Sequence, residues 1–60
     1  MAELKVTWFV LNGIRWVEVS QVLFLCIMKK TCERVTFYDG LSLYTDKDGK
    51  AIGMMICKEV

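Results

Sequence analysis

The side chains that could carry out acid–base chemistry are few in this sequence and poorly placed for it. Histidine, the commonest general base and metal ligand, is absent. The acidic residues lie mostly in expected turns and near the chain ends, where water surrounds the carboxylate and nothing poises it for proton transfer. The sequence also has no glycine-rich phosphate loop and no serine in a nucleophile-elbow motif. We therefore expect a protein without enzymatic activity.

Two groups of residues have side chains of the kinds that bind metal ions. The segment 46–49, Asp-Lys-Asp-Gly, begins like a calcium loop but has Lys47 where an oxygen ligand is needed, so we expect a solvated hairpin loop. Cys26, Cys32 and Cys57 are too few for a structural zinc site and lack its two-residue spacing. Cys26 lies in an apolar run and is expected to point into the core. We predict no metal and no cofactor.

The densest basic cluster is formed by Lys29, Lys30 and Arg34. Such residues could contact nucleic-acid phosphates. Lysines also flank apolar strands, where they prevent pairing with strands of other chains. Glu33 lies beside Arg34 and lowers the net positive charge of the cluster. Because the formal net charge of the chain is only +1, no strong field attracts a polyanion. Nucleic-acid contact by this cluster is therefore kept as the alternative function.

Size and composition point to self-association. Sixty residues form one small β-rich domain, 1–60, and 55% of them are hydrophobic. A body this small has too much surface to hide that many apolar groups, so a second copy of the chain is the expected cover. The longest apolar run, Val22–Met28, is far too short to span a membrane, and the first residues do not form a signal peptide. An odd cysteine count fits reduced thiols, so we expect a cytoplasmic protein.

The first part of the chain predicts a β-hairpin. Segments 4–11 and 14–20 alternate as strands do, and Asn12-Gly13 between them is typical of a type I′ turn. This turn would place Phe9 opposite Trp16 and Leu11 opposite Ile14. One small sheet cannot hide such a patch, so we predict that Phe9, Leu11, Ile14 and Trp16 form an oligomer or partner interface.

The apolar run Val22–Met28 is ambiguous between two structures. Ser20 could cap a helix over Gln21–Lys30, whose Gln, Leu, Met and Lys residues are good helix formers. The run is short and apolar all round and contains Val, Phe and Ile, which favours a buried central strand. We expect the strand and keep the short helix as the alternative, with 29–33 as a polar connection.

The remainder of the chain predicts further strands. Segments 35–38 and 41–45 flank the turn pair Asp39-Gly40, and 51–58 forms the last strand, with Gly53 marking a bulge or a close backbone approach. Their alternation would give one face to the following residues: Tyr38, Leu41, Leu43, Ile52, Met54 and Ile56. The expected fold is mainly β, a small five-stranded antiparallel meander or hairpin-based sheet.

Part of the chain resembles a known family. Val17–Leu25, Lys29-Lys30 and Arg34–Tyr38 are similar to a portion of a LytTR-type DNA-binding domain. The resemblance covers about a third of the chain and implies strands around Val22 and a role in gene regulation. The chain ends before the basic DNA-contacting segment of that family, so no site residue is carried over.

Together these observations favour a small non-enzymatic regulatory protein, of the inhibitor or adaptor type that phages encode. We expect it to associate with itself and to act by docking on another protein. The alternative is a nucleic-acid-binding regulator that uses Lys29, Lys30 and Arg34. A second alternative is a small-ligand binder with its site between subunits. No membrane partner is expected.

Overall fold

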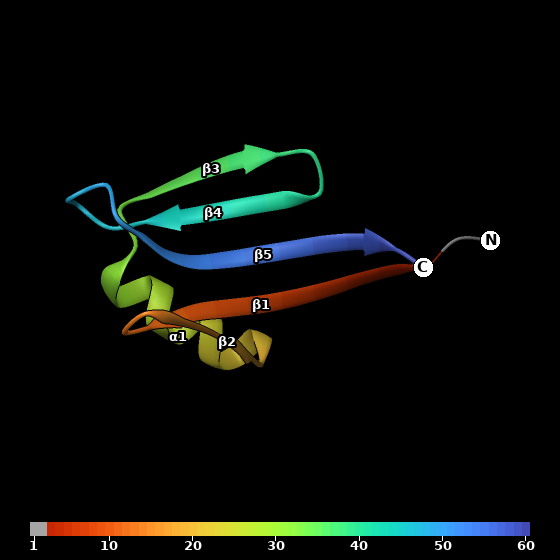
Figure 1. Ribbon diagram of the computed structural model, residues 1–60, viewed down its shortest axis with the longest axis horizontal. Helices are drawn as coiled ribbons and strands as arrows, with labels where there is room; N and C mark the ends of the chain where they lie inside the picture. Colours follow the sequence, from red (N-terminus) through yellow and green to blue (C-terminus); the bar gives the residue numbers. More distant parts are fainter. Residues whose placement is uncertain (1–2) are drawn as a thin grey trace.

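A single antiparallel sheet with a helix on one face makes up the computed structural model, which describes residues 3–60 (Figure 1). The strands lie in the order β2-β1-β5-β4-β3. This confirms the mainly β class with five antiparallel strands. The sheet is the hairpin-based form and not a simple meander, because β5 lies between β4 and β1. The elements are β1 (Leu4–Asn12), β2 (Arg15–Val19), α1 (Gln21–Thr31), β3 (Arg34–Tyr38), β4 (Leu41–Thr45) and β5 (Ala51–Glu59).

The turn between β1 and β2 lies one residue later than the sequence predicted. Asn12 pairs with Arg15, so Gly13 and Ile14 take the two central positions. Gly13 has a φ of 68° while Ile14 has a negative φ, the pattern of a type II′ turn instead of type I′. Every pair of the ladder is therefore offset by two residues from the expected one. A shift of two leaves each side chain on the face expected for it.

The run Val22–Met28 lies within a helix, so the predicted central strand is wrong and the alternative is confirmed. The Ser20 side chain caps the helix by accepting a hydrogen bond from the Leu23 backbone N–H at 3.2 Å. The helix continues to Thr31, into the segment 29–33 that was expected to be a polar connection, of which Cys32 and Glu33 remain as the connection to β3. Strong local helix formers and a cap outweighed the β-branched and aromatic residues here.

The helix also corrects two expectations that depended on a strand. The strands that the LytTR-type resemblance implied around Val22 are absent, because this segment is α1. Cys26 was expected to point into the core but is exposed on the helix surface. The core side of α1 is instead defined by Phe24 and Met28, four residues apart and both buried.

The helix sits on the sheet over Gly53 of β5. A Cβ atom at Gly53 would lie 2.7 Å from the Met28 Sδ atom and 3.1 Å from the Phe24 ring. The Phe24 ring also meets the Tyr44 ring edge to face, with centroids 4.9 Å apart. The expected close approach at Gly53 is confirmed, and the ladder between β4 and β5 is irregular beside it.

The loop between β4 and β5 is held by its own aspartate. The Asp46 carboxylate accepts backbone N–H bonds from Asp48 at 2.9 Å and Lys50 at 3.0 Å, and Gly49 has a φ of 81°. This is the expected hairpin loop, in which the carboxylate serves the turn. Within residues 3–60, no helix has the length and apolar character that a membrane span requires.

Candidate functional site

The face of the sheet turned away from α1 carries a group of eight apolar side chains to which all five strands contribute. Gly53 lies under the helix, so its neighbour Met54 points to the opposite side of the sheet. Phe9 pairs with Met54, which pairs with Leu43 on its other side. The register thus joins the apolar residues of both halves of the chain. We call this surface the open face and define it by Phe9, Leu11, Trp16, Tyr38, Leu41, Leu43, Met54 and Ile56.

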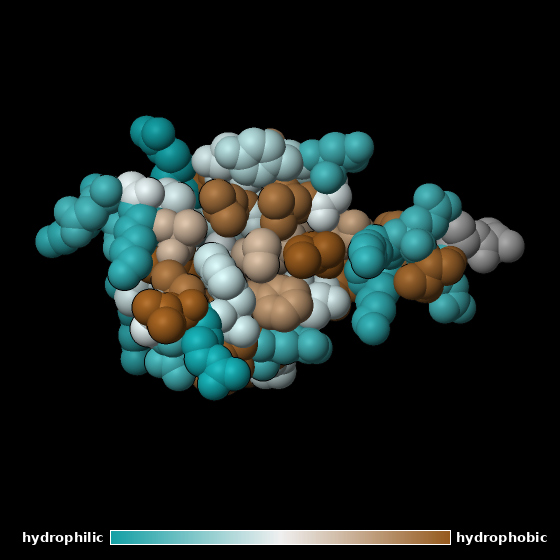
Figure 2. Space-filling model, viewed as in Figure 1, coloured by the Kyte–Doolittle hydropathy of each residue, from teal (hydrophilic) through white to brown (hydrophobic). Residues whose placement is uncertain are grey.

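None of the side chains of the open face is buried. Trp16 is 40% exposed and Tyr38 is 57% exposed, and the others are half-buried by their neighbours on the sheet. Hydrophobic side chains gather over β4, β5 and β1, and hydrophilic ones lie toward the ends of the molecule (Figure 2). Large contiguous apolar patches are rare on monomeric soluble proteins and are typical of interaction surfaces.

The structure places three of the four predicted interface residues on the open face. Leu11 pairs directly with Trp16, and Phe9 lies two residues from Leu11 on the same side of β1. Ile14 instead lies in the turn and is 96% exposed. Because the turn is displaced by one residue, Ile14 is outside the ladder and has no assigned face.

The β4 and β5 residues of the open face were not part of the predicted interface. Their alternation did indicate that Leu41, Leu43, Met54 and Ile56 share one face, as they do. Ile52, expected with them, lies at the irregularity between β4 and β5 and lines a separate pocket. The missing information was the β1–β5 pairing, which connects the two ends of the chain and has no local signal.

One end of the open face carries charge. Lys5 of β1 lies directly opposite Lys58 of β5, and like charges in such a pair repel. Glu18 of β2 lines the same shallow hollow, which has a volume of about 270 Å³ and includes Phe9 and Ile56. The apolar surface therefore has a rim of both signs.

The core on the other side of the sheet is small. Phe24 and Met28 are the buried apolar side chains of the described residues. The chain exposes 4817 Å², whereas a folded monomer of its mass exposes about 4,000 Å² by the usual scaling. The excess follows from the elongated shape of the chain, whose extents are 40 × 21 × 20 Å, together with its small core.

The helix also carries apolar side chains on its outer side. Val22 is 74% exposed, and Leu25 and Cys26 are exposed as well. No acidic residue occurs in α1, and the last turn contains Lys29 and Lys30. This outer side of α1 is a second apolar surface, bordered by positive charge.

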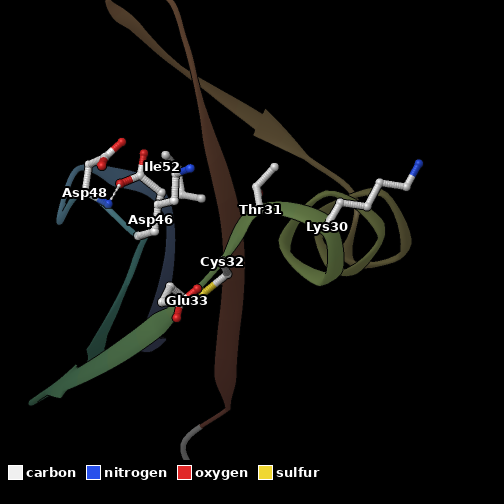
Figure 3. Close-up of a pocket in the computed structure, with 8 residues that line it drawn as sticks. Lys30, Thr31, Cys32, Glu33, Asp46, Asp48 and Ile52 are labelled. Carbon is white, nitrogen blue, oxygen red and sulfur yellow. Dashed lines mark hydrogen bonds between the residues drawn. The ribbon is translucent and has the colours of Figure 1, made fainter.

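The predicted basic cluster is spread over two elements. Lys29 and Lys30 end α1, whereas Arg34 begins β3. Lys30 borders a pocket of about 450 Å³ that Glu33, Asp46 and Asp48 also line. In Figure 3 the Lys30 side chain extends away from the two aspartates. The pocket lining thus combines basic and acidic residues, and the three residues of the predicted cluster come from two different elements.

The same pocket has little capacity for metal or nucleophilic chemistry. The Cys32 Sγ atom lies 3.4 Å from the Arg34 carbonyl oxygen, and Asp46 is used by the backbone of its own loop. Among residues 3–60, no three His, Cys, Asp or Glu side chains lie together as metal ligands would. The open face is thus the candidate functional site.

Comparison with known proteins adds no relative: no family model, no curated protein and no solved structure matches the chain.

Proposed function

We propose that this protein is a non-enzymatic binding protein that associates with itself through the open face and regulates another protein by docking on it. One observation carries the proposal: the eight apolar and aromatic side chains of the open face have no element over them, while Phe24 and Met28 are the buried apolar side chains of the described residues. Covering that face removes apolar area from water, and this is the main favourable term in association.

A second copy of the chain is the occupant that fits the open face. Two sheets can pack face to face about 10 Å apart, with the side chains of their inner faces interdigitating. The rim of the face carries Lys5 and Lys58 on one side of the hollow and Glu18 on another. Because the rim has both signs, a second copy can bring its carboxylate to the lysine pair of the first.

Paired open faces leave the helices on the outside of the assembly. The apolar outer side of α1, with Val22 and Leu25, then remains available to another protein. The surface of the other protein that binds α1 would be apolar with an acidic border, because acidic side chains complement Lys29 and Lys30. The proposal retains the inhibitor or adaptor role and the cytoplasmic location expected from the sequence.

The nucleic-acid alternative has less support. Nucleic-acid-binding surfaces concentrate positive charge on one face, whereas Lys30 and Arg34 here share their surroundings with Glu33 and two aspartates. The small-ligand alternative requires a site between subunits. The 270 Å³ hollow lies on the open face, and a second copy packed there would close or fill it.

Light scattering after size-exclusion chromatography tests the proposal. Trp16→Glu places a charge within the open face and should lower the molar mass or cause aggregation. Ile14→Glu is the matched control, because Ile14 lies in the adjacent turn and outside the ladder. A wild-type protein that runs as a stable monomer at tens of micromolar would overturn the proposal.

The docking half of the proposal has a separate test. A tagged wild-type protein should co-purify with a protein from its native host. The variant Val22→Glu should lose this protein, whereas the control variant Gln21→Glu should retain it. Equal retention by both variants would show that the outer side of α1 is not the docking surface.

A further inference from the structure

The strand β3 forms an edge of the sheet that lacks the usual protection. In the strand order β2-β1-β5-β4-β3, β3 pairs with β4 on one side only. Natural edge strands are shielded by proline, a bulge or a charged residue in mid-strand, because their free N–H and C=O groups attract other strands. The β3 sequence Arg-Val-Thr-Phe-Tyr contains no proline, its register with β4 is regular, and its one charge is at its start.

The opposite edge of the sheet differs from β3. This edge is formed by β2, which carries Arg15 and Glu18, and beyond the end of β2 by 4–7 of β1, which carries Lys5. Glu18 lies inside β2, where a charged side chain opposes pairing with a strand of another molecule. Of the two edges, β3 is the one open to a further strand.

The side chains of β3 are also unusually apolar for their exposure. Phe37, on the helix side of the sheet, is 77% exposed, and Tyr38, on the open face, is exposed too. Both extend from the last two positions of the strand. A strand added beside β3 would cover them.

We propose that β3 pairs antiparallel with β3 of a second copy, about a two-fold axis that passes through Thr36. In this register Thr36 lies opposite Thr36 of the partner subunit. Val35 lies opposite Phe37 of the partner subunit, and Arg34 opposite Tyr38 of the partner subunit. The contact is isologous, as the commonest dimer interfaces are.

This register matches the chemistry of the strand with itself. A β-branched residue beside an aromatic ring and threonine beside threonine are both favourable cross-strand pairs. The guanidinium of Arg34 meets the face of a tyrosine ring, a cation–π contact. No like charges face each other, and the single charge of each strand has an aromatic partner.

The pairing joins the two sheets with their faces aligned. Opposite residues have numbers of the same parity, so the open face of one copy continues into that of the other and both helices lie on the same side. The result is one sheet with twice the number of strands.

The joined sheet also supports the proposed function. One open face measures about 24 Å across by about 20 Å along the strands, so pairing two of them buries about 1,000 Å² in total, near the lower limit for a specific interface. Two joined sheets would pack over about twice that area. This consequence rests on the proposed function, whereas the β3 pairing itself does not.

Disulfide trapping tests the pairing. Thr36→Cys should give a dimer linked by the two introduced cysteines, because directly opposite Cα atoms in antiparallel strands are 4.5–5.5 Å apart, within the reach of a disulfide. Phe37→Cys is the matched control: this position is more exposed, yet its two copies are diagonal and beyond that reach. Mass spectrometry of tryptic peptides separates these links from those of the native cysteines. The expected result is linkage at least about tenfold faster for Thr36→Cys. Equal rates, or no linkage through position 36, would overturn the pairing.

A charge swap at the same position does not depend on cysteine chemistry. In the Trp16→Glu background, where the open-face contact is already removed, Thr36→Lys alone and Thr36→Glu alone should each lose the edge contact, because like charges then face each other at the axis. An equimolar mixture of the two variants should associate again. A mixture that behaves as the average of its components would overturn the pairing.

The failure of this proposal is distinguishable from failure of the proposed function. In a Trp16→Glu background, the Thr36→Cys disulfide should still form, because Trp16 lies on β2 at the far edge of the sheet. A disulfide that forms while Trp16→Glu leaves the wild-type molar mass unchanged would support the β3 pairing and reject the open-face contact.

Discussion

Met28 packs directly over Gly53, with its Sδ atom where a side chain at position 53 would begin. The absence of a side chain there lets α1 sit close to β5, and Phe24 then reaches the Tyr44 ring. This contact holds the helix to one face of the sheet and thereby leaves the other face open.

Gly53→Val should lower the free energy of unfolding by about 1–3 kcal/mol, because the added methyl groups overlap Met28 and Phe24. The measurement is urea denaturation at a fixed protein concentration. In the double variant with Met28→Ala, the loss should be smaller than the sum of the two single losses, since the truncated side chain makes room. Additive losses would mean that the two residues do not compete for the same space.

Ser20→Ala should lower the free energy of unfolding by about 1 kcal/mol, because the Leu23 backbone N–H loses its hydrogen-bond acceptor. Ser20→Asp keeps an acceptor and should retain the stability of the wild type. The same denaturation experiment measures both. Wild-type stability in Ser20→Ala would contradict the role of Ser20 as the N-cap of α1.

Leu43→Glu should lower the molar mass measured by light scattering, as is also expected for Trp16→Glu, although the two residues lie on different strands. Both belong to the open face. Val22→Glu on the outer side of α1 is the control and should leave the molar mass unchanged. The reverse result, with dissociation only in Val22→Glu, would place the self-association on the helix.

Replacing Lys29 and Lys30 together by glutamate should destabilise the protein by about 0.3–1 kcal/mol per residue, because both lie in the last turn of α1 near its negative end. The loss should shrink at high salt, and Lys47→Glu in the β4–β5 loop should not show it.

Fluorescence anisotropy at low salt should detect no binding of duplex or single-stranded DNA by the wild type. Binding that falls steeply with salt and disappears in the double variant would favour the nucleic-acid alternative.

The sequence predicted those features of the structure that depend on residues close together in the chain. Alternation and turn residues predicted strands at 4–11, 14–20, 35–38, 41–45 and 51–58, near their observed positions, and Gly53 was correctly marked as a close approach. The apolar run Val22–Met28 was assigned to the wrong element, because a short block that is apolar on all sides has no period to separate helix from strand. The local signal that does indicate a helix is Ser20, which is the N-cap of α1.

The candidate site was predicted only in part, for a different reason. Phe9, Leu11 and Trp16 were found because a hairpin pairs residues that are close in sequence. Met54 joins them through the β1–β5 ladder, whose partners lie between 43 residues (Val10 and Gly53) and 55 residues (Leu4 and Glu59) apart along the chain and share no turn to fix their register. Ile14 was misplaced because a type II′ turn at Gly13-Ile14 and a type I′ turn at Asn12-Gly13 both accept the same sequence.

The central claim is that the open face of one copy is covered by the open face of another. An isotope-filtered NOE experiment on a mixture of labelled and unlabelled protein tests it most directly. We predict intermolecular NOEs between the methyl groups of Leu43 or Ile56 in the labelled chain and the Trp16 ring in the unlabelled chain. Absence of these NOEs from a sample with sharp Trp16 signals and the molar mass of a single 7.0 kDa chain would contradict the claim.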